Sequence, residues 1–147
     1  MTSAQNPKTI ILAGGGVRRE GVAGGTITPG MLISGPDSAL VPHGDAGNLA
    51  QAAFALEYDL TGRGINDDYS AGDQVLYSVL NEGSEVYAIL ADGEDVSKGD
   101  PLTSHGDGKL AAASATNFVV ARALEDKTAS GEDERIRVVI ERGTLQA

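Results

Sequence analysis

The chain has 147 residues, the size of a single domain, and can bury a core without a disulfide or a structural metal. Its 11 basic and 21 acidic residues give a net charge of −10, which argues against general nucleic-acid binding and against docking on an anionic membrane surface. Cysteine is absent, which excludes disulfides, thiolate catalysis and cysteine-ligated zinc, and no apolar run approaches the roughly 20 residues of a membrane span.

The first 26 residues differ in composition from the rest of the chain. Residues 9–13 are typical of one short strand, and six glycines then fall between Gly14 and Gly25. Glycine at this density cannot maintain a helix. We therefore expect an extended, loosely structured, glycine-rich arm over residues 1–26, followed by a β-rich domain over residues 27–147.

Three basic residues, Lys8, Arg18 and Arg19, lie in this arm, beside a strongly acidic body. A flexible basic arm can lie on an acidic neighbour and become ordered there, so these three residues are the predicted interface. A solvated tail that contacts nothing is the alternative.

Short strand-like runs separated by turns begin at residue 27. In residues 51–59 large apolar side chains occur at every second position, which favours a half-buried strand. The alanines of residues 46–55 leave a short helix as an alternative. Residues 74–80 and 85–91 are the clearest β runs, and the four-residue loop between them contains glycine. That pattern predicts a β-hairpin.

The last third of the chain continues in the same way. Residues 109–113 predict a short strand, and residues 117–124 and 135–142 predict a second hairpin. In the final strand the even-numbered apolar residues share one face. The connecting segment, 125–134, is charged and predicts a solvated loop. Together with the many glycines, these runs predict an all-β domain, either a small barrel or a sandwich.

A short turn motif occurs three times: an apolar residue, Ser or Thr, any residue, Gly, two residues, and an apolar residue. The copies are residues 27–33, 69–75 and 96–102. Each glycine can supply the positive φ of a tight turn that starts a strand. Biotinyl and lipoyl carriers use a similar turn, but their modified lysine sits at a hairpin tip, whereas Lys98 precedes a strand.

Two groups of residues could carry binding chemistry. The run from Ile10 to Gly16 resembles the opening of a dinucleotide fold, but Arg19 stands where the third glycine is needed. The tripeptide His-Gly-Asp occurs at residues 43–45 and again at 105–107, and could in principle supply metal ligands. Both copies lie in turn-rich sequence, where Gly and Asp are expected for backbone reasons, so solvated turns are the preferred interpretation.

Catalysis has no positive support in the sequence. The acidic residues at 125, 126 and 132–134 lie in a predicted solvated loop, which lacks the burial that a general acid needs. No Gly-x-Ser-x-Gly motif occurs. We therefore expect a protein that is not an enzyme and that needs no cofactor and no metal.

Several segments, taken in order, resemble the head decoration, or cement, proteins of tailed bacteriophages. The resemblance covers roughly residues 27–141, and the order of its segments is more specific than any one of them. The segments are residues 42–48, 53–57, 64–75, 83–88, 96–102, 106–110 and 121–126.

The resemblance implies a β protein of the virion, placed on the outer surface of an icosahedral phage head. Such a protein would bind the major capsid protein, bridge neighbouring capsid subunits, and often form a homotrimer. Under this interpretation Lys8, Arg18 and Arg19 are the candidate capsid or subunit contacts, and neither nucleic acid nor membrane is a partner. A β-barrel carrier or ligand-binding module is the alternative, although six aromatic residues offer few pocket walls.

Overall fold

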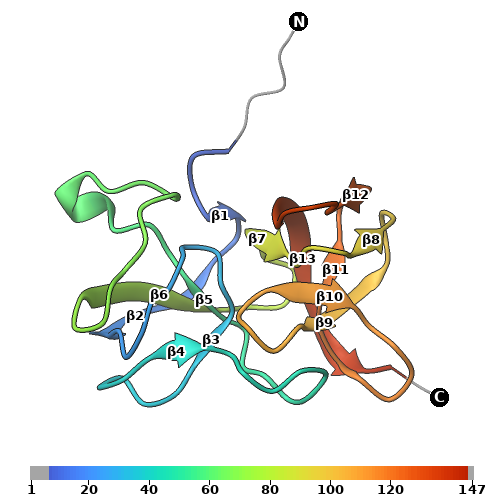
Figure 1. Ribbon diagram of the computed structural model, residues 1–147, viewed down its shortest axis with the longest axis horizontal. Coiled ribbons are helices and arrows are strands. Elements are labelled where there is room, and N and C mark those ends of the chain that lie inside the picture. Colours follow the sequence, from blue (N-terminus) through green and yellow to red (C-terminus); the bar gives the residue numbers. More distant parts are fainter. Residues whose placement is uncertain (1–6, 146–147) are drawn as a thin grey trace, which may run out of the picture.

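The computed structural model describes residues 7–145, which form an almost entirely β-structured domain (Figure 1). The one helix in this part of the chain is a single 3-10 turn, η1 (Asp59–Thr61), so none of the described helices is long or apolar enough to cross a membrane. The strands are β1 (Ile11–Ala13), β2 (Gly16–Val22), β3 (Ile33–Ser34), β4 (Val41–Pro42), β5 (Ala53–Ala55), β6 (Gln74–Leu80), β7 (Glu85–Leu90), β8 (Asp95–Val96), β9 (Pro101–Ser104), β10 (Leu110–Ala112), β11 (Phe118–Ala123), β12 (Lys127–Thr128) and β13 (Glu134–Thr144).

Five strands close into a small barrel in the right-hand half of Figure 1. Around the ring β7 pairs with β10, β10 with β9, β9 with β11, and β11 with β13, and β13 returns to β7. The short strand β1 pairs with β7 from outside the ring. Closure of the ring pairs backbone groups at strand edges that would otherwise be exposed. The predicted all-β, barrel-like class is therefore confirmed.

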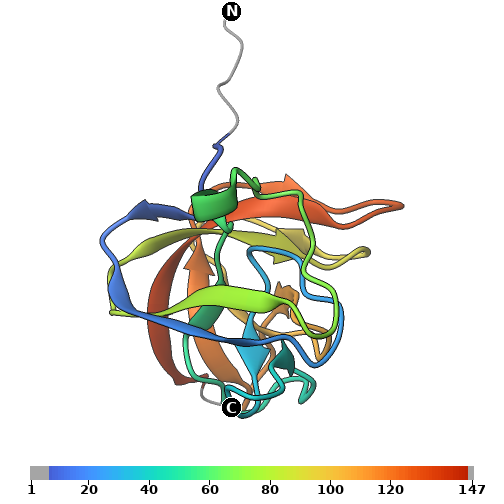
Figure 2. The same cartoon turned by 90° about the vertical axis from the view of Figure 1, so that its left-hand side faces the viewer.

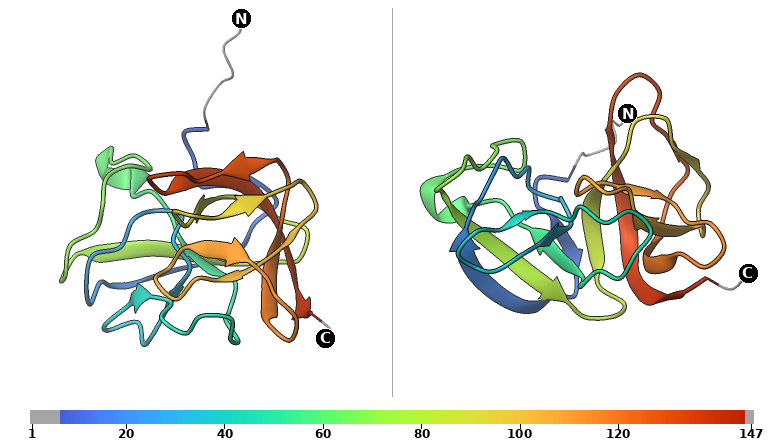
Figure 3. Two further views of the ribbon diagram at one scale, coloured as in Figure 1. Left: turned by 45° about the vertical axis from the view of Figure 1, so that its right-hand side comes forward. Right: turned by 60° about the horizontal axis from the view of Figure 1, so that its bottom comes forward.

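A second sheet of three strands, in the order β2-β6-β5, lies beside the barrel (Figures 1 and 3). Its central strand β6 pairs with β2 over seven residues and with β5 over three. Figure 2 shows β2 and β6 running together across the face of the molecule opposite the barrel. Among the described strands β2 pairs with β6 alone, so it forms an edge of this sheet.

The two faces of this sheet belong to different cores, because side chains alternate along a strand. Leu76 and Leu80 of β6 join the larger cluster, which fills the barrel and includes Leu102 and Ile136. Val75 of β6 joins a smaller cluster on the other face. The larger cluster thus connects the barrel to the sheet, and the two sheets form one domain.

The predicted hairpin of the last third is confirmed. β11 pairs antiparallel with β13, and Ile136, Val138 and Ile140 of β13 are buried while Arg137 and Glu141 are exposed. This alternation is the one that the sequence predicts, and it places the apolar face of β13 inside the barrel.

The three predicted turns share one hydrogen-bonding unit. Gly30, Gly72 and Gly99 all have positive φ, between 91° and 96°. In each copy the glycine N–H donates to the carbonyl of an alanine on another segment, and that alanine N–H donates back to the carbonyl of the residue after the glycine. The bonds of 2.7–3.0 Å couple Gly30 with Ala55, Gly72 with Ala23, and Gly99 with Ala123.

The same unit recurs where the sequence motif is incomplete. Gly83 pairs with Ile140 and Gly93 with Ala129 in this reciprocal way. A further copy has Thr116 in the glycine position, at φ 71°, paired with Leu145 directly after β13. Thr116 is the one described non-glycine residue with positive φ. One turn-and-strand unit therefore builds much of the domain.

The first predicted hairpin differs from the structure. Residues 74–80 and 85–91 are strands but not a hairpin, because β6 and β7 lie in different sheets. The turn between them gives its Gly83 N–H to the Ile140 carbonyl, so the chain passes to β13 instead of folding back on β6. The strand favoured within residues 51–59 is present as β5, and the helix left open over residues 46–55 is absent.

The expected loose arm also differs in the part that the structure describes. Residues 16–22 form β2, in full register with β6, and the flanking Ile10 and Ala23 are buried in the cores. Glycine here allows β2 to approach β6 closely, because a Cβ on Gly16 would lie 1.9 Å from the Val79 carbonyl oxygen. Residues 1–6 of the predicted arm lie outside the described residues.

Candidate interaction surfaces

The strand β2 presents an exposed edge that carries two of the predicted interface residues, Arg18 and Arg19. Its first five residues are exposed, and within the described chain it pairs with β6 alone. At its far end the Val22 N–H donates to the Asp37 carbonyl, and the Val22 carbonyl accepts from Leu40 N–H, at 2.7 and 2.8 Å. These bonds mark which backbone groups of β2 point away from β6.

By the alternation of an antiparallel ladder, the backbone groups of Arg18 and Glu20 point outward in the same sense as those of Val22. Val17 and Arg19 direct theirs toward β6. The edge is therefore open at Arg18 and Glu20 and is covered at Val22 by the segment around residues 37–40.

Arg19 is committed to contacts within the domain. Its Nε donates to the Tyr77 hydroxyl at 3.2 Å, and its guanidinium lies 3.4 Å from an Asp37 carboxylate oxygen. The Tyr77 hydroxyl donates to the other Asp37 oxygen at 2.5 Å. Tyr77, followed by Arg19, lowers the pKa of Asp37 below its usual value, while burial and then Asp37 raise the pKa of Tyr77. These three side chains, a triad of Arg19, Tyr77 and Asp37, link β2 to the 37–40 segment.

Arg18 lies on the opposite face of the strand and forms no ion pair within the described residues. It lines a groove of about 370 Å³ with Gly16, Glu57 and Ser78. Ser78 is fully buried, and its Oγ is the one buried side-chain polar atom of residues 7–145 without a hydrogen-bond partner. Arg18 pairs with Ser78 across β2 and β6, but the Ser78 hydroxyl is shielded from solvent, and the carboxylates of Glu57 and Asp59 line the groove beside Arg18.

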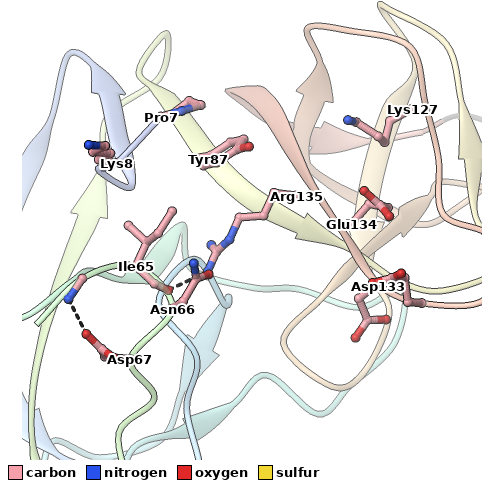
Figure 4. Close-up of a pocket in the computed structure, with 12 residues that line it drawn as sticks. Pro7, Lys8, Ile65, Asn66, Asp67, Tyr87, Lys127, Asp133, Glu134 and Arg135 are labelled. Atoms are coloured by element: carbon pink, nitrogen blue, oxygen red, sulfur yellow. Dashed lines mark hydrogen bonds between the residues drawn. The ribbon is translucent and has the colours of Figure 1, made fainter. Parts of the chain in front are cut away.

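Lys8 lies elsewhere, on the wall of an open cleft of about 730 Å³ (Figure 4). Arg135, which is half-buried, extends along this cleft. It donates to the carbonyls of Pro29 and Ile65, both at 2.7 Å, and stacks 5.8 Å from the centre of the Tyr87 ring. Desolvation lowers the pKa of Arg135, because burial disfavours its charge.

The structure thus separates the three predicted interface residues. Lys8 lines the cleft and Arg18 lines the groove, whereas Arg19 forms its contacts on the opposite face of β2. Arg135 could not be recognised from the sequence, because an outward-facing arginine in an alternating strand gives no sign of a distant carbonyl partner. Ser78 could not be recognised either, because it resembles any other polar position of a half-buried strand.

The two His-Gly-Asp turns meet in space, but their side chains do not converge. His43 is buried, with Nδ1 2.7 Å from the Ser104 hydroxyl and Nε2 3.1 Å from the Leu49 carbonyl, so Nε2 is the donor. His105 is exposed and lies 3.1 Å from its own Asp107. No three His, Asp or Glu side chains of residues 7–145 gather to hold a metal. The contact between the turns is structural.

The acidic residues of the 125–134 segment are mostly engaged as backbone partners. Glu125 accepts from the Arg137 N–H and Asp126 from the Lys98 N–H, at 2.9 and 2.8 Å. Asp133 accepts from the Asp92 N–H at 2.9 Å and pairs with Lys109 at 2.8 Å. These carboxylates fix the geometry of surface turns, and the arrangement provides no buried acid for proton transfer.

Comparison with solved structures finds chains of similar fold. The crystal structure of the head fiber gp8.5 N base in bacteriophage phi29 matches the chain with a TM-score of 0.58 and 18% sequence identity. The match covers 89% of this chain and 98% of that chain. No family model matches the sequence, and neither does any curated protein. At this identity the likeness shows a shared fold.

Proposed function

We propose that this chain is a structural protein of a phage head, which binds the outer surface of an icosahedral capsid and bridges neighbouring subunits of the major capsid protein. The observation that carries the proposal is the fold match, which takes in nearly all of the phi29 head-fiber base and most of this chain. Between residues 27 and 141, several segments follow one another in the same order as in decoration proteins, and this resemblance supports the same role independently.

The charge of the chain suits an outward position. At a net charge of −10, the protein would be repelled by packaged DNA and would stay soluble on an outer face. The proposed role requires no catalysis and no cofactor. Recognition would rest on a few basic side chains, among which Arg18 is exposed and unpaired within the described residues.

Stabilisation of the capsid would follow from mass action. A protein that binds the assembled shell and not its separated subunits stabilises the shell by RT ln(1 + [L]/Kd). If the chain acts as a homotrimer, as we propose, simultaneous contacts with several capsid subunits add avidity without any new type of contact.

Co-sedimentation with undecorated, expanded capsids from the same source tests the proposal. We expect binding that saturates at a fixed ratio to capsid subunits, and that ratio would indicate the symmetry position. If the folded protein stays in the supernatant at every concentration, the proposal is wrong.

A ligand-binding module is the second candidate, and the cleft beside Arg135 favours it. A volume of about 730 Å³ is within the range of small-molecule sites, and Tyr87 supplies an aromatic wall. A cleft ligand would raise the melting temperature of the wild-type protein, and less so that of Lys8→Ala. A screen of small polar compounds that finds no such shift would remove this candidate.

A further inference from the structure

We infer that the cleft beside Arg135 binds a neutral, polyhydroxylated ring, such as one sugar unit of a glycan. The inference rests on the second candidate function, which it deepens by naming the class of ligand, and it does not depend on capsid binding. Three features of the cleft support it: polar side chains that the protein already holds in place, charges of both signs, and an aromatic side chain with an unused hydroxyl.

Arg135 is a fixed hydrogen-bond donor in this cleft. Its guanidinium is held by the carbonyls of Pro29 and Ile65, both at 2.7 Å, and further N–H groups of the guanidinium remain available. Figure 4 shows the Arg135 side chain between the two sides of the cleft, with Ile65 and Asp67 on one side and Glu134 on the other. A donor that is already held in place loses little conformational entropy when a ligand binds.

Fixed acceptors line both sides of the same cleft. Asp67 uses one carboxylate oxygen to accept from the Gly64 N–H at 2.7 Å. Across the cleft, Asp133 accepts from the Asp92 N–H at 2.9 Å and pairs with Lys109 at 2.8 Å. Because a carboxylate has lone pairs for several hydrogen bonds, both groups can still accept from a ligand. A matching ligand therefore donates to these carboxylates and accepts from Arg135.

The mixture of charges around the cleft excludes a ligand with a strong charge of either sign. The cationic lining residues are Lys8, Lys127 and Arg135, and the anionic ones are Asp67, Glu132, Asp133 and Glu134. A charged ligand would lie beside groups of its own sign, which is costly. A hydroxyl group is neutral and both donates and accepts, so a ring that carries several hydroxyls can bond to both kinds of side chain at once.

Tyr87 supplies the third feature. It is half-buried in the cleft, and its hydroxyl makes no hydrogen bond to the described residues. A tyrosine presents an apolar ring and a polar tip, so it can contact the C–H groups and a hydroxyl of one sugar ring. The volume of about 730 Å³ lies within the range of small-molecule sites, and the open shape leaves room for a ring that belongs to a longer chain.

The surroundings of Tyr87 argue against a peptide, the other neutral ligand with many donors and acceptors. Extended peptides gain affinity from an open strand edge and from pockets for their side chains. At Tyr87 the strand β7 has neighbours on both sides, because Tyr87 pairs with Arg137 of β13 and donates its N–H to the Ile10 carbonyl at 2.8 Å. Recognition in this cleft thus depends on side chains, as a sugar ring requires.

Saturation-transfer difference NMR on the full chain tests the inference with defined oligosaccharides at millimolar concentration. The neutral probes are trimers of glucose, mannose, galactose and N-acetylglucosamine. Trimers of glucosamine and of galacturonic acid are the matched cationic and anionic controls, and a capped alanine–serine–alanine peptide is the neutral control that is not a sugar. We expect saturation of the ring protons of at least one neutral trimer, and little or none in the three controls.

Three results would overturn the inference: no saturation of any neutral trimer, a charged trimer that binds as tightly as its neutral counterpart, or a peptide that binds as tightly as the best sugar. Binding of a charged trimer or of the peptide would still leave a ligand-binding module in place, with a different ligand. Capsid co-sedimentation is measured separately, so its failure would not affect this result.

Variants of the lining residues show whether the sugar occupies this cleft. Tyr87→Phe keeps the ring and removes the hydroxyl, so the Kd of the best neutral trimer should rise about three- to tenfold. Lys127→Ala should also raise it, whereas Lys98→Ala, which alters an exposed lysine outside the cleft, should leave it unchanged. An unchanged Kd in both Tyr87→Phe and Lys127→Ala would place the sugar elsewhere and overturn the inference.

A further variant tests the role of charge. Glu134→Gln keeps a hydrogen-bond acceptor and removes one negative charge from the cleft. The Kd of the neutral trimer should then stay within about threefold, while the galacturonic acid trimer should bind more tightly than it does to the wild type. Loss of neutral-sugar binding together with unchanged galacturonic acid binding would contradict the argument from mixed charges.

Discussion

β2 and β13 lie at opposite sides of the domain (Figure 1), and they contribute in different ways. β13 pairs on both sides, with β7 and β11, and buries Ile136, Val138 and Ile140 inside the barrel. β2 pairs on one side only, and most of its residues are exposed. Because the two strands share the same backbone geometry, the difference lies in what covers them: β13 stabilises the fold, and β2 presents a surface.

The most direct way to break this comparison is to remove side-chain volume from each strand. Ile136→Ala leaves a cavity in the barrel and should lower the free energy of unfolding by about 2–5 kcal/mol. Val17→Ala on β2 removes an exposed side chain and should change it by about 0.5 kcal/mol or less. Urea-induced unfolding of both variants measures the difference. Similar losses would show that β2 also holds a core.

A second test concerns the glycines that let β2 approach β6. A Cβ on Gly16 would meet the Val79 carbonyl oxygen and the Leu80 Cα, so Gly16→Ala must displace the start of β2 and should cost about 1–3 kcal/mol. Gly15 has open space where its Cβ would lie, so Gly15→Ala is the control and should be nearly neutral. Equal effects on the denaturation midpoint would contradict this account of the glycine-rich segment.

The sequence predicts those parts of the fold that depend on local patterns. The alternation of Ile136, Val138 and Ile140 identifies β13 and its buried face, and the turn motif identifies positive φ at Gly30, Gly72 and Gly99. Both depend on residues close together in the chain: side-chain period in the strand, and backbone freedom in the turn.

Features that depend on distant partners could not be predicted. The loop after β6 is typical of a hairpin, but its reciprocal backbone bonds with Ile140, far along the chain, join it to β13 instead. Composition makes residues 14–25 resemble a loose arm, because glycine that permits close packing looks the same as glycine that permits disorder. The position of Arg18 beside Ser78 likewise follows from pairing of β2 with β6, which no local pattern specifies.

A smaller effect is expected where the end of β13 is fastened. Thr116 has φ 71°, a conformation that is costly for a β-branched residue, and its N–H donates to the Leu145 carbonyl. Thr116→Gly should relieve the strain and raise the free energy of unfolding by about 0.5–1 kcal/mol. The melting temperature should then rise by about 2–4 °C. Thr116→Ala keeps the unfavourable φ and should gain less. A lower melting temperature for the glycine variant would contradict the prediction.

The smallest expected effect lies on β2 and depends on pH. The Tyr77 hydroxyl, followed by Arg19, lowers the pKa of Asp37, so the charged carboxylate is favoured in the folded state. A lowered pKa contributes stability that is present above the ordinary aspartate range, near pH 4, and is lost as the pH falls through the folded-state value. Tyr77→Phe should therefore destabilise the protein at neutral pH and progressively less below about pH 4.

Thermal unfolding of this variant and a control over a pH series would show whether the triad matters. Tyr87→Phe is the control, because the Tyr87 hydroxyl, on the strand beside β13, makes no hydrogen bond to the described residues. Its difference from the wild type should not depend on pH in the acid range. A pH-independent loss in Tyr77→Phe would mean that the contact between β2 and the 37–40 segment depends on packing and not on the Asp37 charge. In that case both strands would be held by the same forces, and β2 would differ from β13 only in its exposure.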